Sequence, residues 1–176
     1  MFLKKFFAGI LFAAMIILPV TSFAAPKVAV IPFENQSARG GTISEDGIMN
    51  VRNFVEEEIV FTNKFSPLDR NNLKKLLDEI KLQQSGLVDP STAARLGKWI
   101  GAEYLVLGNV TGLGAKKDSK YVANLSLRMI KVETAEIYLA GRGTGQAKTA
   151  LDALQKAAED ALKGKRGMLT MMRGGK

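Results

Sequence analysis

The chain has 176 residues, a formal net charge of +8 at pH 7, and neither histidine nor cysteine. These absences exclude serine–histidine relays, cysteine nucleophiles, disulfides and zinc sites built from imidazole or thiolate ligands. The length suits a single domain with a substantial hydrophobic core.

The N-terminal residues have the pattern of a secretory signal peptide. Two lysines precede an uncharged apolar run over residues 6–20. Ser22 and Ala24 are small residues at the −3 and −1 positions of a cleavage site, which predicts a signal peptide over residues 1–24. The apolar run is shorter than the roughly 20 residues that span a bilayer, so a cleaved leader is favoured over a membrane anchor.

The exported chain is expected to be periplasmic, with neither a lipid anchor nor a transmembrane segment. No cysteine is present to carry a lipid, and no other apolar stretch is long enough to cross a bilayer. The chain has 25 Lys and Arg, two of them in the leader, against 17 Asp and Glu. This positive excess favours acidic partners or contact with an anionic membrane surface, and export argues against nucleic acid.

The first elements of the exported chain are predicted to be a strand, a loop and a helix. Residues 27–33 form a short β-branched run that is typical of a buried strand. Residues 34–45 are polar and contain adjacent glycines, which indicates a loop. Residues 46–61 carry apolar side chains at helical spacing, with Ser44 as candidate N-cap. The acidic run 56–58 is expected to be a solvated face of this helix.

A short strand and two helices are expected next. Residues 65–69 predict an edge strand, because Pro67 cannot donate a hydrogen bond to a neighbouring strand. Residues 71–84 have the apolar stripe of an amphipathic helix. Another helix begins at Asp89, an N-cap followed by proline in the first helical position, and it ends at Gly101.

Three strands are predicted in the second half of the chain. Residues 104–110 are a strongly apolar run, hence a central strand, and residues 111–120 form a loop with glycines and lysines. Residues 121–132 alternate between apolar and polar, which indicates a strand with one wet face. Residues 133–136 form a tight turn, and residues 137–145 return as the hairpin partner.

The last periodic segment is a helix that Thr149 caps and Gly164 ends. Its inner face is expected to contain Leu151, Leu154, Ala158 and Leu162. Residues 165–176 have no periodicity, and we expect a basic flexible tail there, after a domain that covers residues 25–164. The element order is β-α-β-α-α-β-β-β-α. It predicts an α/β (α+β) fold, a two-layer sandwich of a mixed sheet with helices mainly on one face.

The glycine-rich residues 141–149 superficially have the composition of a phosphate-binding loop. Such a loop needs glycine directly before its lysine, and here Gln146 and Ala147 intervene. We interpret Gly141 and Gly143 as positions where a helix packs closely on the strand. No pair of carboxylates has the spacing of an acid and a base, and the sequence therefore predicts no catalytic residue, cofactor or metal site.

Two basic segments are the candidate partner-binding surface. The loop before the alternating strand contributes Lys116, Lys117, Lys120 and Tyr121. The C-terminal segment mixes positive charge with methionines, which adapt to the groove of a partner. Its candidate residues are Lys163, Lys165, Arg166, Met168, Met171 and Arg173. A plain exposed loop and a solvated tail without a role are the alternatives.

An ordered series of short motifs resembles the CsgG family of curli production assembly/transport components. The matching stretches are residues 28–37, 69–79, 84–90, 94–97, 101–108 and 132–137. The resemblance implies a periplasmic domain that works by protein contact and is similar in fold to the lipoprotein activators of penicillin-binding proteins and to the TolB amino-terminal domain. It brings no catalytic residue.

The chain departs from the curli channels in three respects. It has no cysteine to be acylated, its connections are too short to supply the channels' membrane-crossing segments, and Ala135 stands in the hairpin turn where glycine is usual. We therefore expect a non-enzymatic accessory protein that binds an envelope partner in curli-like assembly or secretion. A ring-forming transport component of the outer membrane, with copies of itself as partners, and an activator of a peptidoglycan synthase remain open.

Overall fold

The computed structural model describes residues 24–36, 43–69, 89–115 and 120–174. The predicted signal peptide and the helix expected over residues 71–84 fall outside these ranges, except for Ala24. The strands are β1 (Lys27–Val30), β2 (Glu34–Asn35), β3 (Ser66–Pro67), β4 (Tyr104–Ala115), β5 (Tyr121–Lys131) and β6 (Glu136–Ala147). The helices are α1 (Glu45–Val60), α3 (Pro90–Ile100), α4 (Ala150–Lys163) and α5 (Met168–Gly174).

The strands form one mixed sheet in the order β3-β1-β4-β5-β6. Strand β1 is parallel to both of its neighbours, whereas β4, β5 and β6 form an antiparallel meander. The short β2 pairs with β4 beyond the end of β1. Strand β6 consequently forms one edge of the sheet, and the short β3 is the last described strand at the other.

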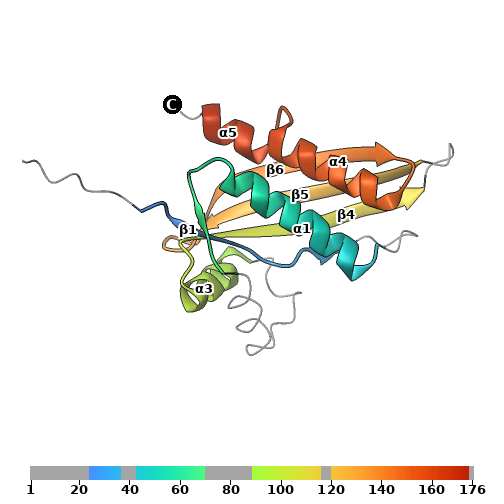
Figure 1. Cartoon of the computed structure of the whole chain (residues 1–176). Helices are drawn as coiled ribbons and strands as arrows, with labels where there is room; N and C mark the ends of the chain where they lie inside the picture. The colour runs from blue at the N-terminus through green and yellow to red at the C-terminus, as the bar shows by residue number, and fades with distance from the viewer. Residues whose placement is uncertain (1–23, 37–42, 70–88, 116–119, 175–176) are drawn as a thin grey trace, which may run out of the picture.

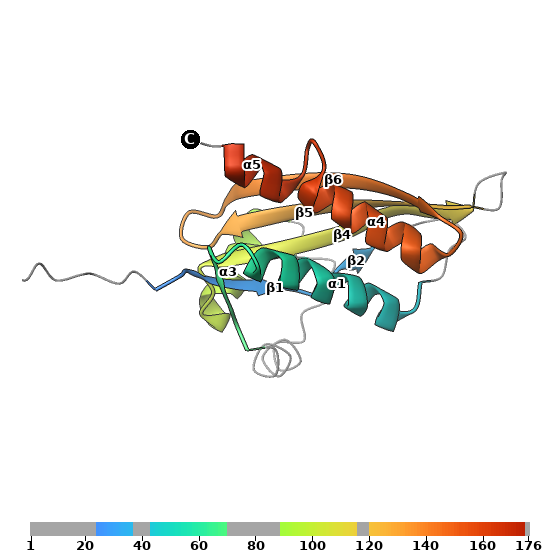
Figure 2. The same cartoon turned by 45° about the horizontal axis from the view of Figure 1, so that its top comes forward.

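Helices α1, α4 and α5 cover one face of the sheet, and α3 packs on the other (Figures 1 and 2). The larger core lies under α1 and α4 and includes the inward side chains of β5, namely Ala123, Leu125, Leu127 and Met129. A smaller core joins α3 to Leu105 and Ile130 on the opposite face. The predicted two-layer sandwich with helices mainly on one face is therefore confirmed.

The predicted caps position three of the helices. Ser44 Oγ accepts from the Gly47 N–H at 3.2 Å, and Thr149 Oγ1 accepts from the Asp152 N–H at 3.1 Å. Asp89 Oδ2 accepts from the Thr92 N–H at 3.1 Å, and the bonds from the Ser91 hydroxyl and from this N–H lower the pKa of Asp89. Each cap satisfies a backbone donor that the first helical turn leaves without a partner.

The glycines of β6 let helix α4 lie directly on the strand. A Cβ at Gly141, Gly143 or Gly145 would overlap a backbone carbonyl of α4, from Ala161, Ala157 and Ala153 in turn. Any side chain would therefore force the helix away. The interpretation of Gly141 and Gly143 as packing positions, rather than as parts of a phosphate loop, is confirmed.

Several predicted boundaries are wrong. Strand β1 ends at Val30 rather than at residue 33, β2 lies in residues expected to form a loop, and β6 continues to Ala147. Strand β4 continues through residues expected to form a loop and ends at Ala115, because its pairing with β5 runs on to the Ala115–Tyr121 pair. A register shift between Val110 and Gly112 leaves Thr111 as the extra residue of a β-bulge. Strand β3 is shorter than predicted and covers only Ser66–Pro67.

The acidic run of α1 is not a uniformly solvated face. Glu56 is buried and its Oε2 lies 3.2 Å from Nη1 of Arg52, which is also buried. The Arg52 guanidinium donates through Nε to the Val30 carbonyl at 2.7 Å. This carbonyl points to the side of β3, whose described pairing with β1 ends at Val28 and Pro67, and Arg52 supplies a donor to it there.

The segment after Gly164 is not the irregular tail that we expected. Residues 168–174 form α5, in which Met168 and Leu169 are buried in the larger core. The sequence shows no helical period there because the helix has only seven residues. In α4, Leu151 is also wrongly predicted, since it is 39% exposed and Ala153 points inward in its place.

Candidate interaction surface

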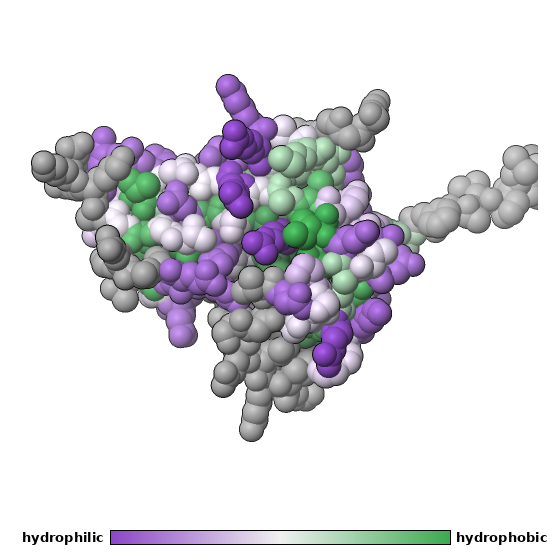
Figure 3. Space-filling view, turned by 180° about the vertical axis from the view of Figure 1, so that it is seen from behind, coloured by the Kyte–Doolittle hydropathy of each residue, from purple (hydrophilic) through white to green (hydrophobic). Residues whose placement is uncertain are grey.

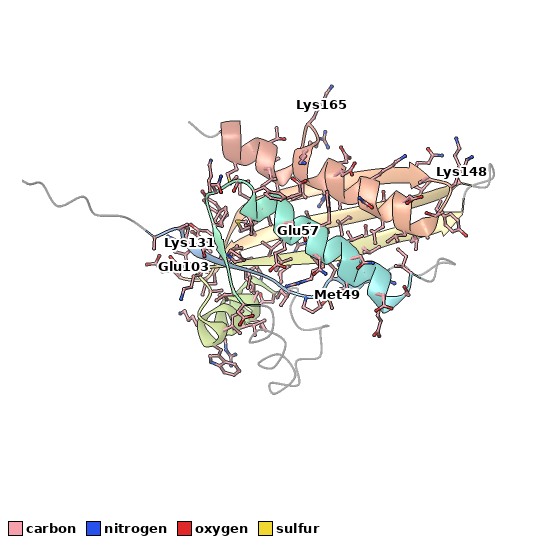
Figure 4. All side chains as sticks on the ribbon, viewed as in Figure 1. Met49, Glu57, Glu103, Lys131, Lys148 and Lys165 are labelled. Carbon is pink, nitrogen blue, oxygen red and sulfur yellow. The ribbon has the colours of Figure 1, made fainter. Side chains whose placement is uncertain are left out.

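The turn between α4 and α5 presents positive charge beside β6. Lys165 and Arg166 are exposed there, and Lys165 points away from the body of the protein (Figure 4). The turn lies close to the strand: a Cβ on Gly141 would be 2.8 Å from the backbone N of Met168. Lys163, at the end of α4, is instead engaged with Glu58 of α1, with Nζ 2.7 Å from Oε2.

The two methionines predicted for this surface differ in exposure. Met168 is fully buried, so its side chain contributes to the core and not to the surface. Met171 is 48% exposed and remains a surface residue. The side chain of Arg173 lies outside the described part of the chain. Among the C-terminal candidates whose side chains are described, Lys165, Arg166 and Met171 are exposed, and Lys163 is exposed within its ion pair.

The structure does not bring the candidate residues of the loop before β5 together with the C-terminal candidates. Lys116 and Lys117 lie outside the described residues, and Tyr121 packs partly buried against the larger core. Lys120 is exposed and borders an open groove of about 560 Å³ beside the first turns of α4. The groove contains lysines and carboxylates in mixture, among them Lys156 and Glu159, so no single sign of charge prevails.

The outer edge of β6 is the feature that sequence reasoning missed. The Thr144 N–H and the Gln146 carbonyl bond to side chains of α4 rather than to β5. Because hydrogen-bonding direction alternates along an antiparallel strand, the N–H and C=O groups of Ala140, Arg142, Thr144 and Gln146 point outward. Asp160 Oδ2 accepts from the Thr144 N–H at 3.0 Å, and Lys156 Nζ lies 3.5 Å from the Gln146 carbonyl. No described residue bonds to the outward groups of Ala140 and Arg142. The sequence could have indicated this edge, because β6 is the last strand of the predicted hairpin and no later strand follows to cover it.

The sheet face opposite α1 and α4 is largely hydrophilic, with smaller hydrophobic areas (Figure 3). It contains a hollow of about 40 Å³ lined by Glu34, Asn109, Ser126 and Arg128, among others. Glu34 Oε1 and Asn109 Oδ1 are buried there with no hydrogen-bond partner in the described structure. The volume suits only water-sized molecules. We therefore do not regard the hollow as a substrate site.

An aromatic row lies at the end of the sheet where β6 begins. The ring centroids of Phe65 and Tyr104 are 5.3 Å apart, and those of Tyr104 and Tyr138 are 5.1 Å apart. Burial, followed by the neighbouring Tyr138, raises the pKa of Tyr104. Tyr138 is 50% exposed, so the row continues from the core onto the surface close to the free part of the β6 edge.

Metal sites and membrane-spanning helices are absent from the described ranges. Among these residues, no group of three or more Asp and Glu side chains is placed to hold a metal ion. No helix formed by them is long and apolar enough to span a membrane.

Comparison with known proteins agrees with the motifs in the sequence. The model of CsgG, the curli production assembly/transport component, matches residues 20–154. No curated protein matches the chain. The expected family resemblance is therefore confirmed by a match over most of the chain.

Solved structures share the fold at low sequence identity. The LpoB C-terminal domain from Salmonella enterica has a TM-score of 0.51 at 20% identity, over 73% of this chain and 87% of that one. The PelC dodecamer from Paraburkholderia phytofirmans has a TM-score of 0.51 at 13% identity, over 81% and 89%. Lipoprotein GNA1162 from Neisseria meningitidis has a TM-score of 0.52 at 11% identity, over 69% and 83%.

Proposed function

The chain belongs to the CsgG family, and from this premise we propose that it is a non-enzymatic periplasmic protein that acts by protein contact in cell-envelope assembly or secretion. The family match carries the proposal. It is supported by the signal-peptide pattern and by the absence of histidine and cysteine, which removes most nucleophilic relays. The mixed charges of the groove and the small size of the hollow supply no pocket shaped for a substrate.

The accessory protein binds its envelope partner through surface features rather than through a cavity. The basic turn of Lys165 and Arg166 lies beside the open part of the β6 edge, and α5, which carries the half-exposed Met171, also contacts β6. Positive charge there favours an acidic partner or an anionic surface.

A ring-forming transport component is the second candidate. PelC, which has the same fold, was solved as a dodecamer. In that case the partner of each subunit is another copy of this chain, and the assembly has a central opening.

The two candidates differ in native mass. We expect the protein recovered from the periplasmic fraction, without its leader, to have the mass of a monomer or dimer by size-exclusion chromatography with light scattering. A discrete assembly of many subunits would favour the ring instead. Retention of the protein in the cytoplasm with its leader intact would contradict both candidates. As a control, the Arg166→Glu variant should have the same mass if the basic turn serves a foreign partner.

A further inference from the structure

We propose that the outer edge of β6, between Tyr138 and Thr144, receives an extended acidic segment of a partner protein as an added strand. The inference rests on the proposed function, since it specifies how a protein that works by contact would hold its partner. An added strand gains affinity from main-chain hydrogen bonds and specificity from the side chains beside it.

The first support is the uneven protection of the edge. An unpaired sheet edge is a template for another chain, and proteins usually block it. Here side chains of α4 block the half of the edge at Thr144 and Gln146. Asp160 accepts a hydrogen bond from the Thr144 N–H, and Lys156 donates one to the Gln146 carbonyl. The half at Ala140 and Arg142 has no such block, although both residues are exposed.

The second support is the charge beside the open half. Arg142 is exposed on the strand itself, and Lys165 and Arg166 stand in the turn that crosses Gly141. Asp160 of α4 already bonds to the Thr144 amide. Side chains alternate along a strand, and because Gly141 and Gly143 face α4, Arg142 lies on the opposite face of the sheet. An added strand with glutamates toward the α4 side would therefore meet Lys165 and Arg166, and one with glutamates toward the other side would meet Arg142. A second copy paired antiparallel through its own β6 would place arginine near arginine, and like charges across strands are destabilising.

The test uses the purified protein and two synthetic peptides of about eight residues that alternate valine with either glutamate or lysine. Backbone amide resonances of Ala140 and Arg142 are followed by NMR, together with their hydrogen-exchange rates. We expect the glutamate peptide to shift both resonances and to slow their exchange, and raised salt to weaken its binding. The lysine peptide should bind at least about tenfold more weakly.

Two kinds of variant separate the backbone contribution from the charge contribution. Ala140→Pro removes an outward N–H without removing a bond to β5, so it should abolish binding of the glutamate peptide. Ala140→Val keeps the N–H and is the matched control. Should the proline variant fail to fold, the Lys165→Glu/Arg166→Glu variant still tests the proposal. This double variant should bind the glutamate peptide about tenfold more weakly and the lysine peptide more tightly than the unmodified protein does.

Equal binding of both peptides, or shifts that leave Ala140 and Arg142 unchanged, would overturn the proposal. Slower exchange of these amides with rising protein concentration, in the absence of peptide, would identify a second copy as the occupant and would also overturn it. A failed peptide test leaves the periplasmic location and the native mass unaffected. Failure of the edge proposal is therefore distinguishable from failure of the proposed function.

Discussion

At the level of single residues, the turn between β5 and β6 contains a backbone conformation that its side chain disfavours. Ala135 has φ of 59°, and its N–H donates to the Lys131 carbonyl at 2.9 Å. A residue with a Cβ loses about 1 kcal/mol in this left-handed region, whereas glycine adopts it freely. The departure noticed in the sequence, alanine where glycine is usual, therefore coincides with a strained position.

We expect Ala135→Gly to raise the free energy of unfolding by about 0.5 kcal/mol, because relief of strain exceeds the extra entropy of glycine in the unfolded chain. Urea unfolding followed by circular dichroism measures the change. Thr134→Gly is the matched control in the same turn. Its φ is not positive, so it should lower the free energy of unfolding by a similar amount. A loss of stability in Ala135→Gly would contradict the argument.

Other residue-level features had no signal in the sequence. The apolar period of α1 placed Val51, Val55 and Ile59 inside, but it placed Glu56 on the solvated side, although it is 3% exposed. Its carboxylate pairs with buried Arg52, and Arg52 in turn donates to the Val30 carbonyl, beyond the described pairing of β1 with β3. Such a chain of contacts joins α1 to β1 and is not visible in the periodicity of either element.

At the level of elements, the contact between α4 and β6 depends on glycines whose space the helix backbone fills. A Cβ at Gly143 would overlap the Ala157 carbonyl, and it would lie 2.9 Å from the backbone C of Asp160. Helix backbone cannot move aside as a flexible side chain can. Because α4 also covers β5 and contacts α1, a shift of the helix would disturb the larger core.

We therefore expect Gly143→Ala to lower the free energy of unfolding by about 2 kcal/mol or more, as overpacking does in a filled core. Gly112→Ala is the matched control on β4. Its Cβ would meet the Asn124 Nδ2 at 2.7 Å, the far end of an exposed side chain whose displacement would disturb only one exposed hydrogen bond, from the Thr144 hydroxyl to Asn124 Oδ1. We expect Gly112→Ala to change the free energy of unfolding by no more than about 0.5 kcal/mol, apart from any gain in strand propensity. Chemical unfolding of both variants decides the matter, and equal losses would refute the packing argument.

The prediction of elements succeeded where the local signal was strong. The N-caps Ser44, Asp89 and Thr149 were recognisable because a short oxygen-bearing side chain preceded an apolar period. The end of β4 was missed, since glycines and lysines resemble a loop until pairing with β5 extends the strand to Ala115. The candidate surface was only partly predictable. Composition indicated Lys165 and Arg166, but the free edge beside them follows from the strand order.

At the level of the whole molecule, the fold includes the segment expected to be a tail. Met168 has 0% exposure and packs with the larger core, whereas Met171 in the same short helix is 48% exposed. Helix α5 has seven residues, too few to be stable alone, so it is held by this packing. Removal of the residues after Gly164 would consequently expose part of the core, and it would not be a neutral test of binding.

The two methionines make this point measurable. We expect Met168→Ala to lower the free energy of unfolding by about 2–4 kcal/mol, because it leaves a cavity in the core. Met171→Ala should change it by less than about 0.5 kcal/mol, since half of its side chain already contacts water. Thermal and urea unfolding of both variants would show the contrast. Equal small effects on the free energy of unfolding would instead favour the original expectation of a flexible tail. If the contrast holds, binding is best tested with substitutions at Lys165 and Arg166, because these exposed side chains are removable while the fold that positions the β6 edge is kept.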